Sequence, residues 1–153
     1  MAMRPVPLSL KGRALRLLSA REHSRAELER RLAGFEEQAG QLAKILDELQ
    51  AKGFINEQRV VESVIHRRAS RVGVARIRQE LQGKGLAGDA IDAAVAVLKT
   101  TEFERARDVW RRKFARPAPD AAGRAKQSRF LAARGFSAEV IRWLISQRGD
   151  EME

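Results

Sequence analysis

One phrase occurs twice in this chain, and the repetition limits the folds that the chain can adopt. Residues 78–91 read RQELQGKGLAGDAI and residues 129–141 read RFLAARGFSAEVI. In both, a Leu stands four residues before a central glycine and an Ile six residues after it, and the two glycines, Gly85 and Gly135, are 50 residues apart. A recurring period of this length is typical of tandem structural repeats, which bury their apolar surface against one another.

The similarity extends along most of the chain. Apolar residues recur at an offset of 49 between the first and second thirds and at an offset of 50 between the second and third thirds. The aligned pairs include Leu32 with Leu81, Leu42 with Ile91, Leu49 with Leu98, Val60 with Trp110, Val64 with Phe114, and Leu81 with Leu131. We therefore predict an N-terminal extension at residues 1–9, repeats at 10–52, 53–100 and 101–149, and an acidic tail at 150–153.

Each repeat carries the signals of three helices. Leu10, Ala14 and Leu17 recur at helical spacing, and Ser24 with Glu27 three residues later is a capping-box pattern that predicts a helix start. Asn56 is a further expected N-cap. With only four prolines, the composition favours helix throughout. The expected fold is all-α, an elongated and curved array of three tandem three-helix repeats resembling helix-turn-helix units.

The glycines of the repeated phrase have a structural explanation. Gly85 and Gly135 are expected to take the left-handed conformation that ends the second helix of a repeat, since a side chain with a Cβ would be strained there. The next residues, Leu86 and Phe136, are expected to pack on the third helix, which Ser137 caps in the last repeat.

The charge of the chain predicts a polyanionic partner. Formal net charge is +10, and residues 101–149 contain 12 basic and 5 acidic side chains. Such an excess favours binding to nucleic acid or to an acidic protein surface. The chain contains no cysteine and no apolar segment long enough to span a bilayer, so we expect a cytoplasmic protein that binds no membrane.

Four ordered segments resemble the RecX family of recombination regulators. They read ILDELQAKGFINEQRV, GVARIRQELQGKGL, ARDVWRRKF and KQSRFLAARGFS, and the resemblance covers the chain from about Leu8 to Ile145. It implies a three-repeat helical protein that binds RecA and restrains its recombinase and ATPase activities, lodged in the groove of the RecA filament on single-stranded DNA. Val60 departs from this pattern, because the family commonly has an aromatic there.

Basic side chains in the second and third repeats are the candidate contacts to the RecA filament and to DNA phosphates, because a guanidinium binds carboxylate or phosphate bidentately. Binding of single- or double-stranded DNA alone is expected to be weak and non-specific, and the protein to be a monomer. The candidates are Arg67, Arg68, Arg71, Arg76, Arg78, Lys84, Arg105, Arg107, Arg111, Arg112, Lys113, Arg116, Arg124, Lys126, Arg129 and Arg134.

The aromatic residues in the basic region have two interpretations. Trp110 and Phe114 have the spacing to stack on bases, but they align with apolar Val60 and Val64, which favours the core. Trp143 either fills an amphipathic face or marks an end that faces a partner, because no fourth repeat covers the last helix.

No arrangement of residues predicts an enzyme, a metal site or a cofactor. Asp89 and Asp92 lie at an expected helix start, where the helix dipole accounts for them. His23 and His66 lack nearby orienting partners, and the GKG at 83–85 lacks the frame of a phosphate-binding loop.

Two other functions stay open from the sequence. The chain has the features of an independent DNA-binding module whose second helices would read bases through Arg76, Arg78, Gln79 and Gln127. The third possibility is a structural adaptor for an acidic protein, which would bind without DNA and leave RecA turnover unchanged.

Overall fold

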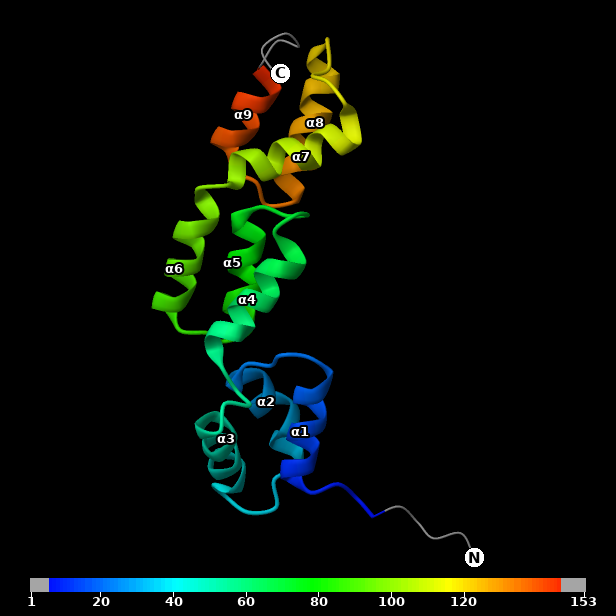
Figure 1. Cartoon of the computed structure of the whole chain (residues 1–153). Helices are drawn as coiled ribbons and strands as arrows, with labels where there is room; N and C mark the ends of the chain where they lie inside the picture. Colours follow the sequence, from blue (N-terminus) through cyan, green and yellow to red (C-terminus); the bar gives the residue numbers. More distant parts are fainter. Residues whose placement is uncertain (1–5, 147–153) are drawn as a thin grey trace, which may run out of the picture. The chain divides into compact units, whose positions relative to one another are not determined.

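The computed structural model describes residues 6–146, and within this range all regular structure is helical (Figure 1). The chain divides into two compact units. The first unit comprises Met1–Val60 and Lys84–Leu86, and the second comprises Val61–Gly83 and Ala87–Glu153. The predicted acidic tail at 150–153 lies outside the described residues. The grouping of helices into three repeats and its boundaries stay a prediction.

The first unit contains three α-helices around one aliphatic core. These are α1 (Leu10–Ala20), α2 (Arg25–Leu32) and α3 (Gln41–Ala51), with a short 3-10 turn at Ala33–Phe35. The predicted capping box is confirmed, because Ser24 and Glu27 exchange side-chain-to-backbone hydrogen bonds at the start of α2. The core consists of Leu10, Ala14, Leu28, Leu32, Leu42, Leu46, Leu49 and Ile55.

The boundary between the units runs through α4 (Glu57–Arg68). Asn56 caps this helix as predicted, its Oδ1 accepting from the Arg59 amide at 2.9 Å. The second unit continues with α5 (Val74–Gly83), α6 (Gly88–Lys99), α7 (Glu102–Phe114), α8 (Ala121–Ala133) and α9 (Ala138–Ser146). No helix within residues 6–146 has both the length and the apolar character needed to cross a bilayer.

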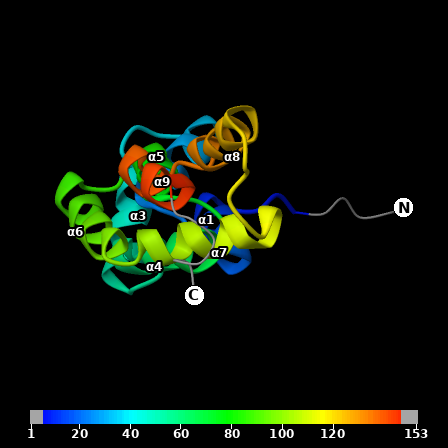
Figure 2. The same ribbon diagram turned by 90° about the horizontal axis from the view of Figure 1, so that it is seen from above.

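Helices α7, α8 and α9 pack on one another in the second unit (Figures 1 and 2). Their core is built around Trp110, which is fully buried. The remaining buried residues of this cluster are Ala106, Val109, Leu131, Phe136, Ile141, Leu144 and Ile145. The expectation that Trp110 belongs to the core is therefore confirmed, and Phe114 packs against the same cluster.

Both glycines of the repeated phrase have the predicted left-handed backbone, with φ of +69° at Gly85 and +86° at Gly135. The structure also shows a second reason for glycine. A Cβ on Gly85 would lie 2.6 Å from the Cβ of Ala26, and one on Gly135 would lie 2.7 Å from the backbone nitrogen of Arg76. Each turn is thus pressed against the first turn of an earlier helix, α2 or α5, where no larger residue fits.

Candidate functional site

The C-terminal turn of α7 presents the most concentrated group of exposed basic side chains. Arg111, Arg112 and Lys113 are exposed, whereas Ala106, Val109 and Trp110 of the same helix are buried. The buried Trp110 donates from Nε1 to the Gln127 Oε1 at 3.2 Å, which fixes α7 against α8. The core side of α7 therefore holds the helix in place while its outer side carries positive charge.

A groove of about 730 Å³ lies between the end of α4 and α7. Its charged and ionisable lining is mainly basic, with Asp108 the one acidic side chain among the lining residues. The Arg112 Nη2 donates to the Ser70 carbonyl oxygen at 2.7 Å and so lies across one part of the groove. The lining residues are Ile65, His66, Ala69, Ser70, Arg105, Asp108, Arg111 and Arg112.

Arg105 has an internal role that the sequence did not predict. Its guanidinium donates to the carbonyl oxygens of Ala69, Val72 and Leu98 at 2.9 to 3.1 Å. Burial lowers the pKa of Arg105 from its usual value. One of these carbonyls directly follows α4, one lies in the turn before α5, and one lies in the last turn of α6. Arg105 therefore links α4, α6 and α7 and has few donors left for an external anion.

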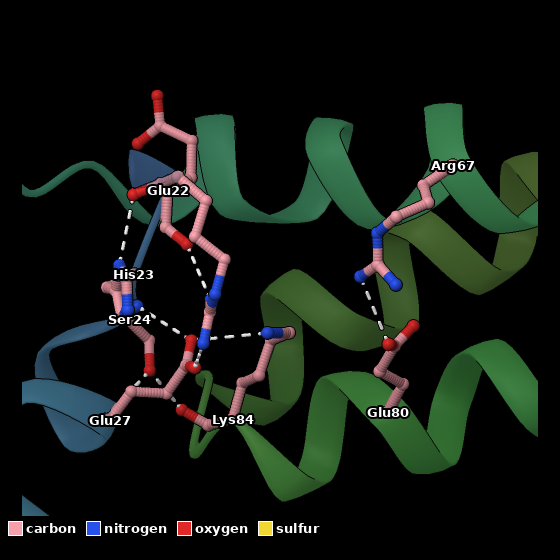
Figure 3. A network of polar contacts seen from close by, with 8 residues as sticks. Glu22, His23, Ser24, Glu27, Arg67, Glu80 and Lys84 are labelled. Atoms are coloured by element: carbon pink, nitrogen blue, oxygen red, sulfur yellow. Dashed lines mark hydrogen bonds and ion pairs between the residues drawn. The ribbon is translucent and has the colours of Figure 1, made fainter. Parts of the chain in front are cut away.

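Three other candidates are also held within the protein. Arg76 donates twice to the Ala133 carbonyl oxygen, at 2.7 and 3.0 Å. Arg67 pairs with Glu80 at 3.1 Å (Figure 3), and Arg78 pairs with Asp92 at 3.4 Å. Surface pairs of this kind are weak, so Arg67 and Arg78 can exchange their partners for a stronger anion at little cost.

Lys84 belongs to a polar cluster at the start of α2 (Figure 3). Its carbonyl accepts from the Ser24 hydroxyl, and its ammonium lies 3.3 Å from the Glu27 carboxylate. Burial opposes ionisation of Glu27, but hydrogen bonds from Arg21 and the Ser24 amide and the charge of Lys84 lower its pKa to about 2. The Lys84 side chain is only 14% exposed, so its main contact is with the Glu27 carboxylate of this cluster and not with solvent.

His23 lies beside the same cluster, 2% exposed, with Nδ1 at 3.0 Å from the Arg21 carbonyl oxygen. Burial lowers its pKa from the usual value. The neutral ring is therefore a packed side chain of the first unit. His66, by contrast, is exposed at the end of α4.

The remaining candidates differ in their surroundings. Arg71, Arg116, Lys126 and Arg129 are exposed and make no side-chain hydrogen bond or ion pair with any residue in 6–146. Three of the others lie over aromatic rings, Arg107 over Phe103 and both Lys113 and Arg134 over Phe130. Arg68 lies near the Glu80 carboxylate, and Arg124 donates to the Pro119 carbonyl oxygen. The candidates thus differ in how available their side chains are to an external anion.

The predicted acidic and glycine-rich features have structural roles. Asp89 lies in the first turn of α6, and the GKG at 83–85 forms the turn that ends α5. Among residues 6–146, no group of three or more His, Cys, Asp or Glu side chains has a geometry able to hold a metal ion.

Two of the four residues proposed to read bases, Gln127 and Arg76, are engaged in contacts within the protein. Gln127 is 5% exposed, and its amide accepts from Trp110 and donates to the Arg116 carbonyl at 3.0 Å. Arg76 is bound to Ala133. A buried glutamine cannot reach a base edge, so Gln127 is not available for base reading in this structure, and Arg76 would first have to leave its carbonyl partner.

Comparison with known proteins identifies two segments of the chain by family. Residues 56–95 match the RecX second three-helix domain, and residues 100–145 match the RecX third three-helix domain. The regulatory protein RecX of Leptothrix cholodnii is 54% identical over 145 residues, covering 95% of this chain and 92% of that protein. The regulatory protein RecX of Ralstonia nicotianae is 50% identical, with 95% and 91% covered.

Two crystal structures share the fold. One is of a regulatory protein RecX, with a TM-score of 0.72 and 21% identity over 90% of this chain and 72% of that chain. The other is of RecX from Lactobacillus salivarius, with a TM-score of 0.74 and 20% identity over 89% and 92% of the two chains. At these identities the similarity supports the helical fold.

Proposed function

The chain belongs to the RecX family, and on that premise we propose that it binds RecA and the RecA filament on single-stranded DNA and inhibits recombinase and ATPase activity. The RecX relatives are regulatory proteins, and such proteins are not enzymes. The chain is accordingly a regulator that acts through binding.

The exposed basic end of α7 is the observation that supports this proposal. Arg111, Arg112 and Lys113 project from a helix whose opposite side is anchored by buried Trp110. A rigid display of positive charge loses little conformational freedom on binding, and its guanidinium groups suit the carboxylates of a protein and the phosphates of a strand. In this proposal the RecA filament on single-stranded DNA supplies both kinds of anion.

Contacts to several RecA subunits would strengthen binding, since each contact after the first is made at high effective concentration. A protein that bridges subunits would also oppose the rearrangements that accompany ATP turnover. In this proposal inhibition is a consequence of bridging, and the basic end of α7 supplies part of the contact.

The proposal is tested by fluorescence anisotropy of the labelled protein. Filaments of cognate RecA on single-stranded DNA, held by a non-hydrolysable ATP analogue, are titrated in parallel with the same DNA without RecA. We expect saturable binding to filaments at concentrations where bare DNA binds little. Equal binding to both would support the independent DNA-binding module, and binding to neither would contradict the proposal.

A further inference from the structure

A second groove, of about 600 Å³, lies between α8 and α9. It is separate from the basic end of α7 and combines an indole ring, two guanidinium groups, two hydroxyls and a carboxylate. The residues that carry these groups are Trp143, Arg124, Arg142, Ser128, Ser146 and Glu139. Of these, only Arg124 is among the basic candidates nominated from the sequence.

Trp143 is the unusual residue of this groove. It is 51% exposed, although it follows buried Ile141 and precedes buried Leu144 on α9. Its ring contacts Phe103 edge to face, with centroids 4.3 Å apart, so its orientation is fixed. Exposed indole surface is costly in water, and a pre-oriented ring loses little side-chain entropy when it gains a stacking partner.

The charged groups around Trp143 fit a nucleotide. Arg142 and Arg124 are exposed, and the Arg124 Nη1 donates to the Pro119 carbonyl oxygen at 2.9 Å, which leaves other guanidinium donors for a phosphate. The Glu139 carboxylate is the one acidic group of the lining. Because every nucleobase has an N–H donor on its Watson–Crick edge, this carboxylate can accept from a base that is stacked nearby.

From this combination we propose that the groove between α8 and α9 binds an unpaired base of a single-stranded nucleic acid. The base stacks on Trp143, and the adjoining phosphates bind Arg124 and Arg142. A duplex is excluded from this mode because its bases are already stacked on one another. The site belongs to the protein itself and requires no RecA, so it goes beyond the proposed inhibition.

The two tryptophans give a direct readout. Trp110 is fully buried, whereas Trp143 is half exposed, so a stacking base quenches the fluorescence of Trp143 alone. The probe is oligothymidylate of roughly twelve nucleotides, which has little stacking of its own. We expect saturable quenching that is lost in Trp143→Leu, together with at least a roughly fivefold weaker affinity by anisotropy of the labelled strand.

The arginines are tested by the salt dependence of binding. In Arg124→Gln/Arg142→Gln, the slope of log affinity against log salt should fall by about 1.4, since each phosphate contact to a single strand contributes about 0.7. Matched controls are Phe54→Leu, which alters an exposed aromatic of the first unit, and Lys44→Gln, which alters an exposed cation of α3. Both controls should bind the strand like the unmodified protein.

Three results would overturn the proposal. The first is an unchanged fluorescence at saturating oligothymidylate, and the second is equal quenching by a duplex of the same length. The third is Trp143→Leu with full affinity for the strand. If that variant instead loses binding to RecA filaments while the strand never quenches Trp143, the groove is a protein-docking surface and contains no base site. None of these results bears on inhibition through α7.

Discussion

Gly73 lies directly against Gly135 in the second unit. The Gly73 amide donates to the Arg134 carbonyl oxygen at 2.8 Å, and the Ala75 amide donates to the Gly135 carbonyl oxygen at 3.2 Å. A Cβ on Gly73 would overlap the backbone of Gly135 and Phe136. At this contact the start of α5 and the turn after α8 meet backbone to backbone, without room for a side chain between Gly73 and Gly135.

Gly73→Ala should consequently lower the free energy of unfolding by about 1 to 3 kcal/mol, because the added methyl forces two backbones apart. Urea denaturation followed by circular dichroism measures the change. Gly88→Ala is the matched control, since a Cβ there meets nothing within 4 Å. We expect the control to be neutral or slightly stabilising. Equal stability of the two variants would show that the contact is not tight in solution.

Glu27 should make the stability of the first unit depend on pH in the acid range. Its folded-state pKa of about 2 lies below the usual range for Glu, so its contribution is fully present above about pH 5. That contribution is lost as pH falls toward 2. We expect Glu27→Gln to reduce the free energy of unfolding at pH 7 by about 1 to 3 kcal/mol and to flatten its dependence on pH between 5 and 2.

The control for Glu27 is Glu29→Gln. Glu29 makes an exposed pair with Arg25 at 3.1 Å, with its side chain 52% exposed, and such pairs contribute little. The control should leave the pH dependence almost unchanged. If the free energy of unfolding of Glu27→Gln varied with pH as it does in the unmodified protein, Glu27 would not be the source of the pH dependence.

Gln127→Ala should destabilise the packing of α7 on α8. The substitution leaves the Trp110 Nε1 without its partner, and an unsatisfied buried donor costs about 1 to 3 kcal/mol. Lys126→Ala, at an exposed neighbouring position, should change the free energy of unfolding by less than about 0.5 kcal/mol. If Gln127→Ala kept full stability but lost affinity for one DNA sequence, Gln127 would be a base-reading residue.

The helices and their ends could be predicted because they depend on neighbours in sequence. The capping box at Ser24, the Asn56 cap and the left-handed Gly85 all follow from residues within one turn. Membership of the core could likewise be predicted for Trp110, which aligns with an apolar residue of the preceding repeat. Local periodicity was sufficient for these assignments.

The roles of individual basic residues could not be predicted in the same way. Arg105 binds carbonyls up to 36 residues away and Arg76 binds one 57 residues away, so their partners are set by tertiary packing. An arginine that caps helix ends has the same local sequence as one that faces solvent. The exposure of Trp143 could not be predicted for a similar reason, because the residues around it come from α7 and α8.

We propose that the basic end of α7 restrains RecA, and the rate of ATP hydrolysis tests this role directly. Cognate RecA on single-stranded DNA is titrated with the unmodified protein and with Arg111→Glu/Arg112→Glu/Lys113→Glu, and ATP hydrolysis is followed. Circular dichroism first establishes that the variant is folded, as expected for three exposed positions.

Asp89→Asn/Asp92→Asn is the control and should inhibit normally. We expect the unmodified protein to suppress hydrolysis and the folded triple variant to need at least about tenfold more protein. Full inhibition by the folded triple variant, or no inhibition by the unmodified protein, would contradict this role of α7.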